Sequence, residues 1–231
     1  MKLKLYADAE AAAGILQRRK EDDAAIAESV RSILQDVRED GDRALFVYSE
    51  RFDGSVLDHS SMFVSRDEIG AAYAALDPAL LASIKKAAAN VLAYHKRDPM
   101  KDVVCTEDGR TTGFVVRPVE RAGIYVPGGT APLFSSVLMG VLPAKAAGVP
   151  HIWVATPAKN GQVHPAVIAA ADICGAERIL KVGGAQAIAA FAYGTESVPK
   201  ADVIAGPGNI YVTLAKKEVY GQVGIDMLAG P

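Results

Sequence analysis

The sequence predicts an α/β protein in which a doubly wound, Rossmann-like parallel sheet follows a mainly helical first part. The main observation is a unit of strand, glycine-containing turn and helix that repeats roughly every 25 residues in the second half of the chain. The composition changes at the start of this repeat, because 38 of the 52 charged residues lie in residues 1–120 and 15 of the 21 glycines lie in residues 121–231. We therefore expect two domains, a solvated helical one over 1–120 and a Rossmann-like one over 121–231.

Length and charge exclude several classes of protein. The chain has 231 residues, of which 50% are hydrophobic and 23% charged, so it can bury a core without a disulfide or a metal. A net charge of −2 and a pI near 6.1 leave no general basic field for nucleic acid or an anionic membrane. Two cysteines, Cys105 and Cys174, are too few for a disulfide framework and suit a cytoplasmic location.

Two segments resemble targeting or membrane sequences and are better explained otherwise. The first residues begin like a signal peptide, but Asp8 and Glu10 interrupt any apolar core. Residues 122–144 carry no charge, yet their prolines and glycines would break a membrane helix. A buried strand, a glycine turn and a packed helix are expected there instead.

Helices dominate the first part. Apolar residues at helical spacing predict a helix from Ile26 to Val37 that stops at Gly41, and a second helix that ends at Gly54. Ser65 and Glu68 form a capping-box pattern at the start of a third helix.

A longer helix and a hairpin complete this part. Asp77 followed by Pro78 is a cap with a first-turn proline, and it opens a helix with an apolar side. Residues 107–110, Glu-Asp-Gly-Arg, predict a hairpin turn between strands at 103–106 and 112–116.

The second part alternates short apolar strands with helices. The predicted strands are 123–126, 152–155, 179–182, 203–205 and 225–227, and the predicted helices are 133–147, 163–174, 186–193 and 209–220. In such a sheet, ligands bind beyond the carboxyl ends of the strands, where turns enter the helices.

Three of those turns are rich in glycine. They are Pro-Gly-Gly at 127–129, Gly-Gly-Ala-Gln at 183–186 and Gly-Pro-Gly-Asn at 206–209. Free N–H groups at a helix start, with little side-chain bulk, suit a phosphate or pyrophosphate. The alternative is that parallel-sheet turns need glycine for tight connections, whatever they bind. Neither the standard dinucleotide fingerprint nor a Walker A sequence occurs, so the turns alone do not name a cofactor.

Other chemistry-bearing residues support weaker hypotheses. The histidines, His59, His95, His151 and His164, lack the spacing of metal ligands, which favours surface or capping roles over a metal site. Cys105 and Cys174 have no base nearby in the sequence, and a buried, unreactive thiol is expected for each. The pair at 135–136, Ser-Ser, lacks a nucleophile elbow, and helix-start polarity explains it.

Four strings carry a resemblance to a known family. Gly-Ile-Tyr-Val-Pro-Gly-Gly-Thr-Ala-Pro-Leu-Phe-Ser-Ser-Val-Leu-Met begins at Gly123, Val-Gly-Gly-Ala-Gln-Ala-Ile-Ala-Ala begins at Val182, and Gly-Pro-Gly-Asn-Ile-Tyr-Val-Thr begins at Gly206. Ile-Asp-Met-Leu-Ala-Gly-Pro follows from Ile225. In this order they closely resemble histidinol dehydrogenase, strongly from about residue 117 and weakly before it.

The resemblance implies an activity and a set of cofactor contacts. The family oxidises L-histidinol to L-histidine through histidinal, at the end of histidine biosynthesis, with two NAD in succession and one zinc ion. Its members have two Rossmann-like domains and form an intertwined homodimer. By motif position, the NAD contacts fall on Tyr125, Gln186 and Asn209, with Gly206 and Gly208 in the same turn. A tyrosine can lie against a cofactor ring, and two amides can donate to phosphate or ribose oxygens.

A departure from the family governs the expected mechanism. The sequence stops at Pro231, where family members continue for about as many residues again, with the substrate serine, the zinc ligands and the Glu-His pair that handles protons. We therefore expect no catalytic residue and no zinc site in this chain, no NADH from L-histidinol by this chain alone, and an incomplete first domain whose uncovered apolar face promotes self-association. A truncated chain, a proteolytic product and a naturally short protein stay open.

Two other functions stay open on the sequence alone. The chain could be a non-catalytic module that binds a nucleotide or another anion. It could also be a remote relative with aldehyde dehydrogenase chemistry, which would need a nucleophilic cysteine at the mouth of the sheet.

Overall fold

The computed structural model describes residues 20–97, 99–128 and 132–228. In the first part these residues form α2 (Lys20–Asp40), α3 (Asp42–Asp53), α4 (Arg66–Ala75), α5 (Pro78–His95), β1 (Val103–Glu107) and β2 (Arg110–Phe114). In the second part they form β3 (Arg121–Tyr125), α6 (Phe134–Ala146), β4 (His151–Ala155), α7 (Pro165–Cys174), β5 (Arg178–Leu180), α8 (Gly184–Tyr193), β6 (Val203–Ala205), α9 (Ile210–Val219) and β7 (Gly224–Ile225).

The predicted α/β fold is confirmed. Five parallel strands pair in the order β5-β4-β3-β6-β7, with Ala122 of β3 opposite Ile152 of β4 and Val203 of β6. The chain moves outward from β3 to β5 and then returns to the other side of β3, which is the doubly wound order of a Rossmann-like sheet. Each predicted strand and helix of this part exists, with ends shifted by up to two residues.

Alternating strand residues supply a core on each face of the sheet. Ala122 and Ile124 of β3 join the core that contains α6 and α7, whereas Tyr125 joins the core that contains α8 and α9. Both faces of the sheet are therefore buried, which explains why the strands are nearly continuous apolar runs.

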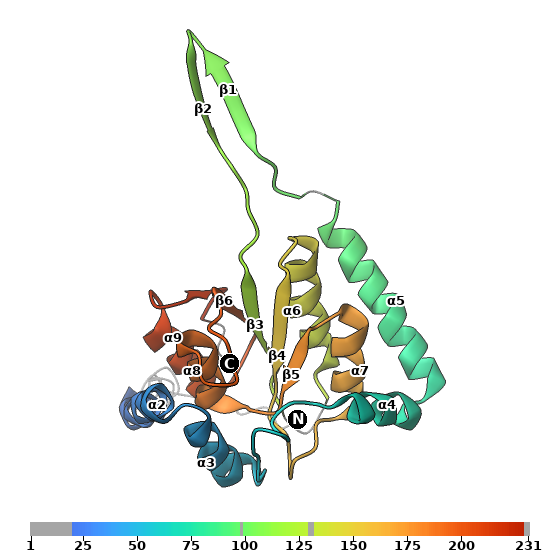
Figure 1. The fold of residues 1–231 in the computed structure, drawn as a ribbon, viewed down its shortest axis with the longest axis vertical. Helices are drawn as coiled ribbons and strands as arrows, with labels where there is room; N and C mark the ends of the chain where they lie inside the picture. Colours follow the sequence, from blue (N-terminus) through green and yellow to red (C-terminus); the bar gives the residue numbers. More distant parts are fainter. Residues whose placement is uncertain (1–19, 98, 129–131, 229–231) are drawn as a thin grey trace, which may run out of the picture.

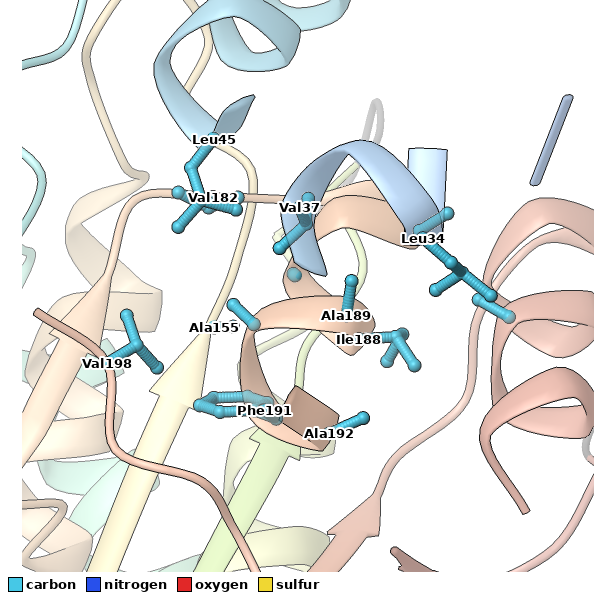
Figure 2. Close-up of a cluster of buried hydrophobic side chains, with 14 of the residues drawn as sticks. Leu34, Val37, Leu45, Ala155, Val182, Ile188, Ala189, Phe191, Ala192 and Val198 are labelled. Atoms are coloured by element: carbon cyan, nitrogen blue, oxygen red, sulfur yellow. The ribbon is translucent and has the colours of Figure 1, made fainter. Parts of the chain in front are cut away.

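The helices of the first part cover these two cores. α2 contacts α8 and α9 on one face, while α4 and α5 contact α7 and α6 on the other. Figure 2 shows Leu34, Val37 and Leu45 of α2 and α3 beside the α8 side chains. Their burial is the main stabilisation of this contact, at about 25 cal/mol for each Å² of apolar surface. The domain division near residue 120 stays a prediction.

The expected helix signals of the first part are confirmed. α2 and α3 meet at Gly41, and Gly54 ends α3 in the left-handed conformation, with φ of 64°. Ser65 and Glu68 form the reciprocal capping box of α4, and Asp77 caps α5, which begins with Pro78. Each motif satisfies N–H groups that the first helical turn leaves unpaired.

A hairpin arm of β1 and β2 projects from the amino end of β3 (Figure 1). Asp108 and Gly109 form its two-residue turn with positive φ angles of 51° and 73°, the geometry that suits a hairpin. Every residue of both strands is exposed. The expectation of a buried Cys105 is therefore wrong, because the arm lies away from both cores.

Of the described residues, no helix combines the length and the apolar character that a membrane crossing needs.

Candidate functional site

The strand order places a crevice at the carboxyl ends of β3 and β6, where the chain direction across the sheet reverses. The turn at 206–209 lies directly over the end of β3. A Cβ atom on Gly206 would lie 2.1 Å from the Tyr125 carbonyl oxygen, and the φ of Gly206 is +123°. Glycine is therefore required here by a close backbone approach as well as by the turn conformation.

The other glycines of the predicted turns are also closely packed. A Cβ at Gly183 or Gly128 would lie 2.4 Å from Pro157, and a Cβ at Gly208 would lie 2.3 Å from Val212. Protein atoms thus occupy the space that these glycines leave, which supports the tight-connection explanation for their presence. Gly129 of the first turn lies outside the described residues.

Tyr125 links β3 to the start of α8. Its hydroxyl oxygen accepts a hydrogen bond from the Gly184 N–H at 3.1 Å. The side chain is buried, with 4% exposed, and burial raises the pKa of Tyr125 to about 12. The hydroxyl therefore stays protonated and keeps a donor. Contact between this ring and a cofactor ring stays a prediction.

Gln186 lies in the first turn of α8 and is 1% exposed. Its Oε1 atom is buried and has no hydrogen-bond partner among the described residues. The helix begins at Gly183 without a side-chain cap, so the positive end of its dipole points at the same edge of the sheet. An unpartnered buried amide oxygen is costly, which marks a place where a donor from a ligand would be favourable.

Asn209 caps α9 and is exposed. Its Oδ1 atom accepts the Val212 N–H at 3.2 Å. This bond uses the carbonyl oxygen of the amide and leaves its two N–H donors unused. The structure therefore buries Tyr125 and Gln186, which both lie next to Gly184, whereas Asn209 is exposed in the 206–209 turn.

Lys216 and Asp226 were not singled out by the sequence analysis. Lys216 is buried in α9, where its Nζ donates to the Gly206 carbonyl at 3.0 Å and to Asp226 Oδ1. Asp226 Oδ2 accepts the Gly206 N–H at 2.9 Å. The sequence did contain a signal for Lys216, because it lies at helical spacing with the apolar residues Val212, Ala215 and Val219. A lysine on such an apolar helix face is expected to be buried.

Asp53 is a third residue that the sequence patterns did not indicate. It ends α3, and its Oδ2 atom is buried without a partner among the described residues. Its negative charge acts on the Tyr125 hydroxyl, which places it near the same edge of the sheet. Burial raises the pKa of Asp53 from 3.8 to about 6.

The Asp53→Asn variant is expected to be more stable than the parent at pH 7.5 by about 1–2 kcal/mol. A two-unit shift corresponds to about 3 kcal/mol, and partial exposure reduces it. The folded state binds this proton more tightly than the unfolded state, so the parent loses stability as the pH rises from about 4 to about 6. Urea unfolding at several pH values measures it: the two proteins should converge near pH 4, and a constant difference at every pH would contradict the assignment.

A cavity of about 700 Å³ adjoins the crevice. Gly206, Pro207 and Asp226 line it at the carboxyl end of the sheet, together with Ser135 and Ser136 at the start of α6. It continues along the sheet face beside β3 and β6 to Arg117. The cavity reaches one of the three glycine turns and none of the buried side chains around Tyr125.

The histidines and cysteines do not assemble into a site. His164 caps α7 by accepting the Ala166 N–H, which confirms a capping role, and His151 pairs with Glu177 at 2.8 Å. Cys174 is buried as expected, and burial raises its pKa to about 11. Within the described ranges, no three His, Cys, Asp or Glu side chains lie together as metal ligands, so these residues do not fit zinc.

The sheet order and the crevice place the chain in the class of Rossmann-like, doubly wound α/β proteins. A family model described as histidinol dehydrogenase matches residues 16–231. The chain belongs to the histidinol dehydrogenase family.

Relatives and a solved structure agree with this assignment. The histidinol dehydrogenase of Syntrophotalea carbinolica is 51% identical over 207 residues, covering 89% of this chain and 48% of the relative. That of Symbiobacterium thermophilum is 49% identical over 217 residues, covering 93% and 49%. The crystal structure of histidinol dehydrogenase from Elizabethkingia anophelis matches with a TM-score of 0.83 at 37% identity, covering 100% and 49%. The chain spans about half the length of these relatives.

Proposed function

We propose that this chain is the NAD-binding part of an enzyme that oxidises L-histidinol to L-histidine through histidinal in histidine biosynthesis. The observation that carries the proposal is the buried Gln186 Oε1 in the first turn of α8, which has no hydrogen-bond partner among the described residues. Membership of the histidinol dehydrogenase family supports the reaction and the substrate.

Two residues at this edge of the sheet supply groups that suit a dinucleotide. Gln186 offers an acceptor that has no partner among the described residues, and the exposed Asn209 has an amide whose two N–H donors are not used in its bond to Val212. The Tyr125 O–H, held by Gly184, is a further donor. Bound NAD supplies the hydride acceptor, and these residues would hold and orient it.

We assign no catalytic residue to this chain, and no step is derived through zinc, because the described residues do not fit the metal. The expectation that the chain alone yields no NADH from L-histidinol stays a prediction. Catalysis requires a base and the alcohol aligned with the dinucleotide, within about 3–3.5 Å.

A homodimer in the cytoplasm is also proposed. The hairpin arm and the residues beside it carry exposed large apolar side chains, namely Met100, Val103, Val104, Phe114 and Val115. Such a patch favours contact with another chain. Two free thiols suit a reducing compartment.

Titration of NAD into the isotopically labelled 231-residue protein tests the cofactor assignment. We expect weak binding, with shifted amide resonances of Gly206, Gly208 and Asn209. Inorganic pyrophosphate is the control ligand: equal responses to pyrophosphate and NAD would favour the alternative function, a module that binds anions. Responses confined to residues 1–120, with the three turn residues unchanged, would contradict the proposal.

A further inference from the structure

The buried lysine Lys216 and the partly exposed carboxylate of Asp226 form an ion pair on the two sides of the Gly206 backbone. The Lys216 ammonium donates to the Gly206 carbonyl, the Asp226 carboxylate accepts the Gly206 N–H, and the two side chains contact each other. The N–H and the carbonyl of a single residue are thus held by two side chains, one from α9 and one from the residue after β7. The two hydrogen bonds, one from Lys216 and one to Asp226, fix the orientation of the peptide groups on either side of the Gly206 Cα atom.

The ion pair of Lys216 and Asp226 is expected to contribute little to the stability of the fold. The Lys216 side chain is 2% exposed and the Asp226 side chain is 31% exposed, so the ammonium has lost nearly all of its hydration. Desolvation of a buried ion pair often offsets its attraction, and apolar residues of similar volume are often as good or better. Position 216 lies on the apolar stripe of α9, where a methionine or leucine would serve stability well. A role other than stability therefore explains the lysine best.

The conformation of the 206–209 turn indicates what the role of Lys216 is. Gly206 has a φ of +123° and lies against the Tyr125 carbonyl, so the turn occupies an uncommon backbone conformation. Asn209, whose amide donors are proposed to contact the dinucleotide, lies three residues further along. Rotation of the Gly206 peptide groups would displace these donors.

We propose that Lys216 and Asp226 are positioning residues that hold the 206–209 turn in the conformation that accepts the dinucleotide. The inference rests on the proposed function for its effect on NAD, whereas its effect on the turn is independent of any ligand. Neither residue acts as a catalytic group.

The test compares Lys216→Met with the double variant Lys216→Met/Asp226→Leu in the 231-residue protein. Three quantities are measured: urea stability, native-state hydrogen exchange without ligand at Val212, whose N–H donates to Asn209 Oδ1, and the dissociation constant for NAD. We expect Lys216→Met to lose stability, because it leaves the Asp226 charge unpaired. The double variant should recover most of that stability, yet both variants should exchange at least about tenfold faster at Val212 and bind NAD at least about tenfold more weakly.

Two matched control variants distinguish an effect on the 206–209 turn from a general loss of stability. Lys181→Met removes another buried lysine, which pairs with Glu68 at 2.5 Å, and it should destabilise the protein without changing exchange at Val212. Lys217→Met removes an exposed neighbour on α9 and should leave NAD affinity unchanged.

The outcomes separate this inference from the proposed function. Parent-like exchange and parent-like NAD affinity in the double variant would overturn the positioning role. If the parent itself does not bind NAD, the cofactor proposal fails, and the exchange measurements alone decide whether the pair holds the turn.

Discussion

Replacing Gly206 with alanine is expected to cost at least about 4 kcal/mol of the free energy of unfolding, a large part of a typical total of about 5–15 kcal/mol. The new Cβ would lie 2.1 Å from the Tyr125 carbonyl oxygen and 3.0 Å from its carbonyl carbon, both of which are backbone atoms of a central strand. The φ of +123° adds backbone strain that an L-residue with a side chain rarely tolerates. Urea unfolding followed by far-ultraviolet circular dichroism measures the loss.

Gly221→Ala is the matched control for this variant. Gly221 has a comparable positive φ of +95°, but no atom of the part of the chain that the structure describes lies within 4 Å of the Cβ position. The control therefore contains the backbone strain without the collision, and a loss of about 1–2 kcal/mol is expected. Equal losses in the two variants would show that the close approach of Gly206 to β3 contributes nothing.

The second large effect is expected at Phe191, where truncation to alanine should cost about 3–5 kcal/mol. Phe191 is 1% exposed on α8, and its ring fills the space above Gly123 in β3. Figure 2 shows it at the centre of the core between α8 and the sheet. Removing the ring leaves a cavity that the surrounding helices and strands cannot close fully.

A double-mutant cycle with Gly123→Ala checks the cause. A Cβ on Gly123 would lie 2.6 Å from the Phe191 ring, so Gly123→Ala alone should cost about 2–3 kcal/mol by overpacking. In the Phe191→Ala background the same change should cost almost nothing, because the colliding ring is absent. Additive losses of the free energy of unfolding would mean that Phe191 and position 123 do not interact.

Local elements of the fold were predictable because their causes lie within a few residues. The capping box of Ser65 and Glu68 and the cap formed by Asp77 before Pro78 need no distant partner. The hairpin turn is likewise specified by a residue pair that adopts positive φ angles. The strand and helix repeat of the second part predicted the parallel sheet for the same reason.

The candidate site was predictable only in part. The motifs located the three turns and the residues Tyr125, Gln186 and Asn209, but not the burial of Tyr125 against Gly184 or the exposed position of Cys105. Asp53 is distant in sequence from the turns that it approaches. Only the tertiary structure shows that its Oδ2 atom is buried without a partner among the described residues.

The sequence by itself determined the class of fold and the positions of the turns, because apolar periodicity, caps and glycine turns act over short distances along the chain. The family followed from the resemblance of four sequence strings to histidinol dehydrogenase. The tertiary structure alone decided that Lys216 and Asp226 enclose Gly206 and that α2 and α3 cover α8. These contacts join elements through side chains whose burial depends on the whole sheet. A charged residue on an apolar stripe signals that it has a partner, but only the fold determines which group that partner is.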